Sequence, residues 1–257
     1  MKPLLSVITV CFNTESTIRN CIDSVACGKT PEVEYLIIDG ASTDSTLSIA
    51  REFSASIDSL VSEPDKGIFD AMNKGLALAR GEFVAFLNAD DVYLSKTISI
   101  ILNAIREDKN NVDVFYGDWI AVSAQGADIP HNADHRLRSR YMLCHQAVIA
   151  KRSIFPSPKG FDLRYKLCAD FNLILLWQAE GLCFKRIPNQ LVRFSEVGAS
   201  SKLVYSAAWE IFTITILRAR FPWKFIFIIR GMAFIARYAL IDLLKYSKPV
   251  NAKKKSN

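Results

Sequence analysis

Two carboxylates and a side-chain amide directly follow a strongly apolar segment. Asn88, Asp90 and Asp91 come straight after residues 83–87, a run of five apolar residues. Such a run is typical of a strand that is buried on both faces of a sheet. In open α/β sheets, ligands bind at the carboxyl ends of strands. Because carboxylate and amide oxygens suit a hard cation that also binds phosphate oxygens, this turn is a candidate site for such a cation.

The segment just before this strand carries further polar residues. Residues 63–67 contain Pro64 and Gly67, which predict an irregular loop. Apolar residues then recur at helical spacing from 68 to 79, so we expect a helix there. Asp70 and Asn73 are three residues apart and therefore share a face of this helix. For Asp70, a structural hydrogen bond and a contact with a bound ligand are both open.

Strands and helices alternate through the first 118 residues. The patterns predict strands at 4–12, 34–38, 57–61, 83–87 and 112–116, separated by helices ending near 26, 53, 79 and 106. This alternation indicates an α/β fold with a doubly wound, mostly parallel sheet. The polar turns at 13, 39–46 and 88–91 should then lie along one edge of the sheet.

The pattern is looser in the second half of the chain. We expect a hairpin or a flap at 119–140, a strand at 145–149, a helix at 168–180 and an extended segment at 184–192. From 205 to 246 the chain is predicted to be helical and strongly apolar, interrupted at Pro222.

The last predicted helix carries a basic stripe on an otherwise apolar surface. The stripe is formed by Lys224, Arg230, Arg237 and Lys245, and these charges leave no uninterrupted apolar run of about 18 residues that could span a membrane. A wide apolar face with basic residues favours a helix that lies in the interface of an anionic membrane. The alternative is a helix that packs on its own domain or on a partner subunit.

Composition narrows the class of protein. The net charge is +6 over 257 residues, with the basic excess beyond residue 136, but no nucleic-acid-binding module is visible. Six cysteines without a CxxC pair favour a reduced compartment. No signal peptide precedes the first strand, so we expect a cytoplasmic protein at the inner face of the cytoplasmic membrane. An oligomer is possible.

Several motifs, in this order, resemble a known family. SVITVCFN, IIDGASTDST, EPDKGIFDAMNKG and ARGEFVAFLNADD are similar to family 2 glycosyltransferases with a GT-A fold over residues 4–118. HQAVIAKR and FDLRYKLCADFNL extend the resemblance more weakly to about residue 195. The resemblance implies an inverting transfer of a sugar from a nucleotide-diphospho-sugar, such as a UDP- or GDP-sugar, usually with Mg²⁺ or Mn²⁺. The sequences of the motifs are most similar to those of enzymes that build exopolysaccharide or O-antigen repeats on lipid carriers.

The resemblance also implies a division of the chain into domains. Residues 1–200 would form the GT-A domain, with a donor-binding half at 1–118 and an acceptor-binding half at 119–200. Residues 201–257 would form helices that associate with a membrane. A Q and an R at 190 and 193 match a motif of processive synthases, but Phe194 replaces its Trp. Without the several transmembrane helices of a synthase, addition of a single sugar is favoured.

The same resemblance assigns roles to individual residues. It implies binding of the nucleotide-sugar by Thr9, Asn13, Asp39, Asp65, Lys66, Asp70, Asn73, Asn88, Ala89 and Asp90. Asp90 and Asp91 would bind the metal, although Asn88 replaces the first Asp of the family's DxD motif. His145 and Gln146 match a pair near the acceptor or the pyrophosphate. Asp170 matches the general base, since an inverting transfer needs a carboxylate to take the proton of the acceptor hydroxyl.

Each of these residues also has a structural interpretation. Thr9 could simply be a β-branched strand residue, and Asp39 a turn or capping aspartate. His145 could be a satisfied polar group, and Asp170 a charge at a helix N-terminus. Asp44 is interpreted as the cap of the second helix and is left out of the site.

Two rival functions remain. A sugar-nucleotide pyrophosphorylase would have a glycine-rich phosphate loop after the first strand, and residues 11–20 contain no glycine. The second rival is a non-catalytic subunit that binds a nucleotide-sugar within a polysaccharide assembly complex. The presence of Asp39, Asp90, Asp91 and Asp170 argues against it.

Overall fold

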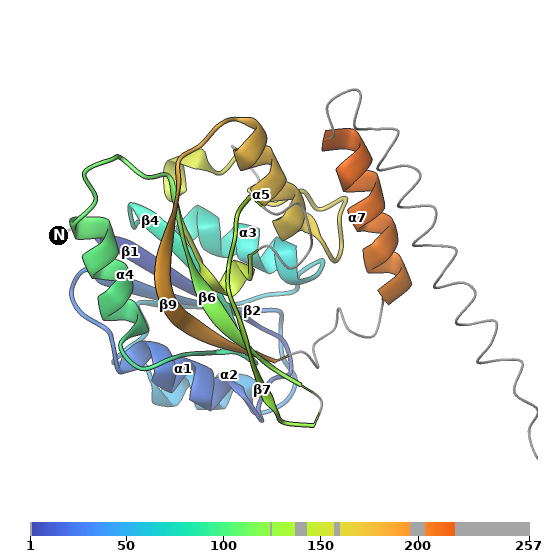
Figure 1. The fold of residues 1–257 in the computed structure, drawn as a ribbon. Helices are drawn as coiled ribbons and strands as arrows, with labels where there is room; N and C mark the ends of the chain where they lie inside the picture. Colours follow the sequence, from blue (N-terminus) through green and yellow to red (C-terminus); the bar gives the residue numbers. More distant parts are fainter. Residues whose placement is uncertain (1, 124, 137–142, 157–159, 196–203, 219–257) are drawn as a thin grey trace, which may run out of the picture. The chain divides into compact units, whose positions relative to one another are not determined.

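The computed structural model describes residues 2–123, 125–136, 143–156, 160–195 and 204–218 (Figure 1). The chain divides into two compact units, Met1–Ser201 and Lys202–Asn257, and each is described by itself.

The first unit is built on one mixed sheet. Its strand order is β3-β2-β1-β4-β8-β6-β9-β5, and β7 pairs with β6. The strands are β1 (Leu5–Cys11), β2 (Val33–Asp39), β3 (Ser59–Ser62), β4 (Phe83–Asn88), β5 (Val92–Tyr93), β6 (Val114–Val122), β7 (Asp128–His131), β8 (Val148–Lys151) and β9 (Phe184–Ser195).

The N-terminal part of this sheet is parallel, as predicted. β1 pairs in parallel with both β2 and β4, and β2 with β3. β8 is inserted antiparallel between β4 and β6, so these two strands run in the same direction without touching. β9 returns parallel to β6. The expected α/β sheet with mostly parallel strands is confirmed, with one antiparallel strand in its middle.

Helices cover both faces of the sheet. They are α1 (Ile18–Ala26), α2 (Thr46–Glu52), α3 (Ile68–Leu78), α4 (Thr97–Arg106) and α5 (Ala169–Ala179). Ile8 of β1 faces α3, where a Cβ on Gly75 would come within 2.4 Å of its Cγ2. The next residue, Thr9, faces Cys21 of α1. Because successive side chains of a strand point to opposite faces, α1 and α3 lie on opposite sides of the sheet.

The structure differs from the sequence prediction in the second half of this unit. Residues 145–149 were predicted as a strand, but His145–Ala147 form the 3-10 helix η1 and the strand begins at Val148. α4 starts at Thr97, and Val92–Tyr93 just before it pair with β9. For residues 119–140, the hairpin alternative holds over the β6–β7 pair.

The second unit contributes one described helix, α7 (Val204–Arg218). The helix expected beyond Arg218, with its basic stripe, lies outside the described residues. In the part of the chain that the structure describes, no helix has the length and apolar character needed to cross a membrane.

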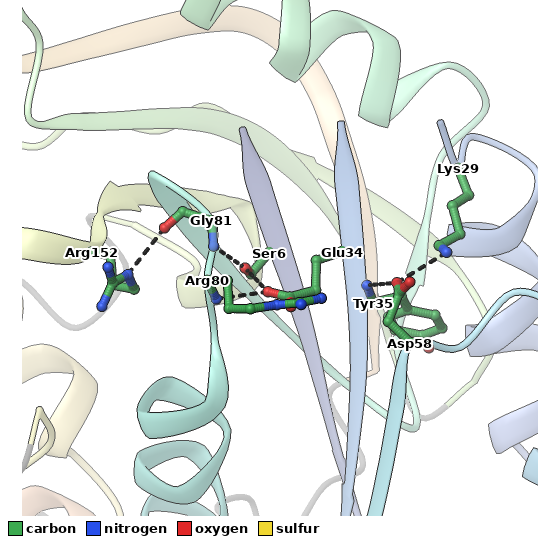
Figure 2. A network of polar contacts seen from close by, with 8 residues as sticks. All are labelled: Ser6, Lys29, Glu34, Tyr35, Asp58, Arg80, Gly81 and Arg152. Carbon is green, nitrogen blue, oxygen red and sulfur yellow. Dashed lines mark hydrogen bonds and ion pairs between the residues drawn. The ribbon is translucent and has the colours of Figure 1, made fainter. Parts of the chain in front are cut away.

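A polar network joins the starts of the strands (Figure 2). Glu34 on β2 is 3% exposed. Its Oε2 accepts hydrogen bonds from Ser6 Oγ (2.6 Å) and from the backbone N–H of Arg80 (2.7 Å), and its Oε1 accepts one from Arg80 Nε. The backbone N–H of Gly81 donates to Ser6 Oγ at 2.8 Å. These contacts fix β1, β2 and the segment before β4 to one another.

The network continues at both sides. Asp58 accepts from the backbone N–H of Tyr35 at 2.7 Å and pairs with Lys29 Nζ at 2.9 Å. Arg152 Nε donates to the carbonyl of Gly81 at 3.1 Å (Figure 2). The contacts at Ser6, Glu34 and Gly81 lie at the amino ends of strands. This network therefore stabilises the sheet at the end opposite to the polar turns.

Replacement of Glu34 tests this network. Burial by itself raises the pKa of Glu34, but hydrogen bonds from Ser6 and Arg80 outweigh it, and the pKa lies below its ordinary value. A carboxylate with a lowered pKa in the folded state stabilises the protein above the unfolded-state pKa and loses this effect as the pH falls through the folded-state pKa. Glu34→Gln should therefore lower the free energy of unfolding at pH 7 by about 1–3 kcal/mol.

Urea unfolding of both proteins from pH 7 downward measures the difference. We expect it to shrink once the pH falls below about 4, the ordinary range of a glutamate pKa. A difference that stays constant down to pH 3 would show that the charge of Glu34 does not carry the effect.

Candidate active site

The three polar turns lie side by side at one edge of the sheet, as the sequence predicts. In the parallel register, Cys11 at the end of β1 is opposite Asp39 at the end of β2, and Val10 is opposite Asn88 at the end of β4. Asn13 then joins the first turn to the second. Its Oδ1 accepts the backbone N–H of Thr43 at 2.9 Å.

Asp39 is fully buried and organises the turn after β2. Its Oδ2 accepts the backbone N–H of Ser42 (2.9 Å) and Ser62 Oγ (2.6 Å), and its Oδ1 accepts Ser42 Oγ. The structure thus brings Asp39 to the expected edge with both carboxylate oxygens bonded to protein donors. A nucleotide base could contact this carboxylate only by sharing or replacing one of these donors.

Phe12 is a site residue that the sequence analysis missed. It follows β1 directly, and its side chain is 59% exposed. A Cβ on Gly40 would come within 3.4 Å of the Phe12 ring and 2.4 Å of Asp65 Oδ2, so these three residues meet at one place. Asp65 is held there because its Oδ1 accepts the backbone N–H of Gly67 at 2.8 Å. An aromatic residue directly before a polar turn was the signal that could have identified it.

Thr9 does not reach this edge. It is fully buried, and its hydroxyl lies 3.1 Å from the hydroxyl of Tyr35, on the face of the sheet that α1 covers. The expected contact of Thr9 with a nucleotide therefore does not fit its position. The structural interpretation as a strand residue accounts for it.

The loop and helix before β4 have mainly structural contacts. Asp70 Oδ2 accepts the backbone N–H of Lys66 at 3.0 Å, which fixes the loop, and the side chain of Lys66 is exposed. Asn73 uses both ends of its amide on the backbone of Phe161, with Nδ2 donating at 2.9 Å and Oδ1 accepting at 2.8 Å. Because its amide is engaged in this way, the expected contact of Asn73 with a donor does not fit the structure.

The acidic turn presents Asp90 outward. The backbone N–H of Ala89 donates to the carbonyl of Val10, and that of Asp91 to the carbonyl of Asn88, so the turn is held on both sides. Asn88 Oδ1 is buried without a hydrogen-bond partner in the described structure. Asp90 lines a cleft of about 240 Å³, together with Thr17, Asn20, Val92, Val122, Arg193 and Ser195. Desolvation in this cleft raises the pKa of Asp90, and the charge of His145 acts in the opposite direction.

Asp91 points inward, contrary to the expectation that it binds a metal. It is 1% exposed. Its Oδ1 accepts the backbone N–H of Ser195 (2.9 Å) at the end of β9, and its Oδ2 accepts Gln146 Nε2 (2.7 Å) on η1. Burial, followed by the charge of Asp90, raises the pKa of Asp91 to about 7. With both oxygens engaged by protein, Asp91 fastens the turn instead of presenting a ligand.

His145 and Asp170 form a pair from different elements. His145 Nδ1 on η1 lies 2.9 Å from Asp170 Oδ2 in the first turn of α5, and both side chains are partly exposed. Burial lowers the pKa of His145, but the hydrogen bond and charge of Asp170, then the charges of Asp91 and Asp90, outweigh it and raise the pKa. The neighbouring Gln146 is 1% exposed and contacts Asp91, so the expected contact of Gln146 with an acceptor does not fit.

The geometry thus separates two chemical functions. Asp90 offers a carboxylate at a cleft, and Asp170, held by His145, offers a second one from the opposite half of the unit. Within the described ranges, no group of three or more His, Cys, Asp or Glu side chains forms a preformed metal site.

Comparison with known proteins agrees with the sequence resemblance. The model of the family described as glycosyl transferase family 2 matches residues 6–165. A PGL/p-HBAD biosynthesis glycosyltransferase of Mycobacterium bovis is 32% identical over 207 residues, which cover 77% of this chain and 76% of the relative.

Solved structures show the same fold. Staphylococcus aureus TarS 1–349 in complex with UDP-GlcNAc has a TM-score of 0.69 at 19% identity, over 83% of this chain. This chain spans 65% of the length of that structure. The mannosyltransferase PcManGT of Pyrobaculum calidifontis, in complex with GDP-Man and Mn²⁺, has a TM-score of 0.63 at 18% identity, covering 91% of this chain and 70% of that one. The expected GT-A fold is confirmed.

The contacts of Asp39 lead to a prediction about the turn after β2. Asp39→Asn places an amide N–H₂ against hydroxyl and backbone donors, so it should lower the free energy of unfolding by about 1.5–3 kcal/mol. Ser62→Ala removes only one of these donors and should lower the free energy of unfolding by less than Asp39→Asn does. Guanidinium unfolding of both variants measures which of them loses more unfolding free energy. Equal losses would contradict the role of Asp39 as the centre of the turn.

Proposed function

The chain belongs to glycosyl transferase family 2, and we propose that it is a metal-dependent inverting enzyme that transfers a single hexosyl unit from a nucleotide-diphospho-sugar to an acceptor hydroxyl. The observation that carries the proposal is the arrangement of carboxylates. Asp90 faces a cleft at the carboxyl edge of the sheet, while the His145–Asp170 pair comes from the second half of the same unit. We assign Asp90 to the leaving diphosphate, which it would bind through a cation. We assign Asp170 to the acceptor hydroxyl.

The donor nucleotide is assigned to the turns after β1 and β2. The exposed ring of Phe12 offers a stacking surface for a base, and Asp65 and Gly40 lie directly beside it. Gly40 leaves room there that a side chain would fill, since a Cβ would collide with Asp65 Oδ2. UDP-GlcNAc and GDP-Man in the two similar structures support a UDP- or GDP-sugar as donor.

Asp90 is the residue assigned to the cation. Mg²⁺ is often bound through one or two carboxylates plus substrate phosphates, and a single outward carboxylate fits this pattern. When bound, Mg²⁺ or Mn²⁺ would neutralise the charge that develops on the leaving diphosphate. Asp91 contributes by fixing the turn, and Arg193, which is paired with Asp128, lines the same cleft as Asp90.

Asp170 is assigned as the general base. As the acceptor oxygen attacks the anomeric carbon, Asp170 takes its proton, and the bond from sugar to phosphate breaks with its electron pair leaving on the nucleoside diphosphate. The reaction needs one displacement, and inversion of the anomeric centre follows. Asp170 lies in the first turn of α5, and His145 Nδ1 contacts its Oδ2 at 2.9 Å, so the carboxylate is held in place for this step.

The acceptor is assigned as a lipid-linked glycan at an anionic membrane surface. Residues 119–200 would form the acceptor half, and residues 201–257 the membrane-associating segment. On α7, Trp209 and Leu217 are 60% and 64% exposed, so two large apolar side chains are available to enter a lipid surface. The basic residues beyond Arg218 in the sequence would add electrostatic attraction to anionic lipid. The name of the mycobacterial relative refers to biosynthesis of PGL/p-HBAD, which supports this choice.

Two substitutions separate donor binding from transfer. Asp90→Ala should abolish metal-dependent donor binding, because it removes the outward carboxylate of the turn. Asp170→Asn should leave donor binding within about threefold and lower kcat by at least about 10²-fold, because the amide cannot accept the proton. Calorimetric titration with UDP- and GDP-sugars in Mn²⁺, together with product assays, measures both effects.

The two variants serve as controls for each other. Loss of donor binding in Asp170→Asn, in protein that melts like the wild type, would contradict the assignment of the base. Full donor binding by Asp90→Ala in Mn²⁺ would contradict the assignment of the cation ligand.

Membrane association is tested with vesicles. The full chain should sediment with vesicles that contain about one third anionic lipid, and a chain ending at Ser201 should remain in the supernatant. Trp209→Ser with Leu217→Ser in the full chain should weaken sedimentation without removing any charge. Sedimentation of the chain that ends at Ser201 would refute the assignment of residues 201–257 to the membrane.

A further inference from the structure

The short helix η1 (His145–Ala147) has two side chains that reach opposite parts of the active site. His145 contacts Asp170 on α5, and Gln146 contacts Asp91 in the acidic turn. Successive residues of a 3-10 helix differ in direction by about 120°, so neighbours naturally point to different elements. A strand, which the sequence predicts here, would instead direct these two side chains to opposite faces of the sheet.

The Gln146 contact is rigid because it is buried and the amide is bonded at both its nitrogen and its oxygen. Gln146 and Asp91 are each 1% exposed, and Nε2 donates to Asp91 Oδ2 at 2.7 Å. The other end of the amide, Oε1, accepts the thiol of Cys144 at 2.8 Å. Asp91 Oδ1 accepts the backbone N–H of Ser195. Since a buried polar pair that loses one partner is costly to leave unsatisfied, η1 cannot shift relative to the acidic turn without a large loss.

The His145 contact sets the base. Its Nδ1 lies 2.9 Å from Asp170 Oδ2, and Asp170 Oδ1 accepts the backbone N–H of Phe171 at 2.8 Å, so the orientation of the carboxylate is restricted at both oxygens. His145 is next to Gln146 in the chain, so the orientation of Asp170 depends on a residue whose position is fixed by the acidic turn. Asp90, beside Asp91, is thereby placed at a fixed separation from Asp170.

We propose that His145 and Gln146 are positioning residues, and that η1 holds the general base in register with the outward carboxylate of Asp90. The expected effects on kcat rest on the proposed function, because they require that the protein transfers a sugar. The proposal replaces the expected contact of both residues with acceptor or pyrophosphate by a role that acts through Asp170 and Asp91. Reactions that depend on orientation lose rate when a group is displaced by about 1 Å, so the effect should appear in kcat.

The kinetic test uses the full chain and the variants His145→Ala, His145→Asn and Gln146→Leu. His145→Ala should lower kcat about 10²-fold with the donor Kd unchanged within about threefold. Asn can place an amide N–H near the position of Nδ1, so His145→Asn should recover at least about tenfold of the lost kcat. Gln146→Leu should lower kcat about tenfold, a typical effect for a residue that orients another.

Thr97→Val is the matched control for loss of a buried hydrogen bond. Thr97 is 2% exposed, and its hydroxyl donates to the carbonyl of Leu191 at 2.7 Å, outside the site. This variant should lower Tm and leave kcat unchanged. The proposal is overturned if His145→Ala keeps the wild-type kcat, if Asn is no better than Ala, or if Gln146→Leu resembles Thr97→Val in kcat.

A second measurement does not depend on any donor. Thermal unfolding of Asp91→Ala, Gln146→Leu and the double variant forms a mutant cycle in Tm. The double variant should lose clearly less than the sum of the single losses, because both remove the same bond. Additive losses would overturn the link between η1 and the acidic turn. A wild-type protein that binds no donor would instead refute the proposed function, while the Tm cycle still decides the link.

Discussion

The buried carboxylate of Asp91 joins the two halves of the active-site edge. An ionisable group with 1% exposure is costly to bury unless its oxygens receive hydrogen bonds, and here Ser195 and Gln146 supply them. These two donors come from the end of β9 and from η1, both far along the chain from the acidic turn. The parallel strands place the turn at the edge of the sheet, and Asp91 then brings the C-terminal half of the unit to it.

The turns share one principle of construction. In the turns after β2 and β4, a buried carboxylate holds the backbone, and a neighbouring residue faces outward. Asp39 bonds the turn after β2, while Phe12 is exposed beside it. Asp91 bonds the turn after β4, while Asp90 faces the cleft. The network of Glu34 at the opposite ends of the strands stabilises the sheet without using any of these residues.

The sequence was sufficient to predict the architecture and the edge, but not the direction of individual side chains. Apolar runs and their spacing predicted β1 to β4 and α1 to α3, and parallel strands necessarily bring their carboxyl ends together. The pattern could not show that Thr9 lies on the face covered by α1, since every residue of β1 is buried. Nor could it separate Asp90 from Asp91, because the partners of Asp91 lie 55 and 104 residues away.

The same limit explains η1. A short apolar run after His145 and Gln146 fits a strand, and only the contacts with α5 and the acidic turn favour a 3-10 helix over its first three residues. The apolar run of residues 4–12 predicts Phe12 as the end of a strand, whereas β1 ends at Cys11 and Phe12 is exposed beside Gly40. Each of these side chains is placed by contacts with residues far away in the chain. Hydrophobic periodicity carries no information on such contacts.

The proposed function requires that this edge of the sheet binds a nucleotide-diphospho-sugar through a divalent cation. Thermal unfolding of the full chain with UDP-, GDP- and dTDP-sugars, each in Mn²⁺ and in EDTA, tests it most directly, because a ligand of the native state raises Tm by mass action. The account predicts a rise in Tm with the sugars of one nucleotide in Mn²⁺, and none in EDTA. Cooperative unfolding at the same Tm with every donor, with or without Mn²⁺, would contradict it.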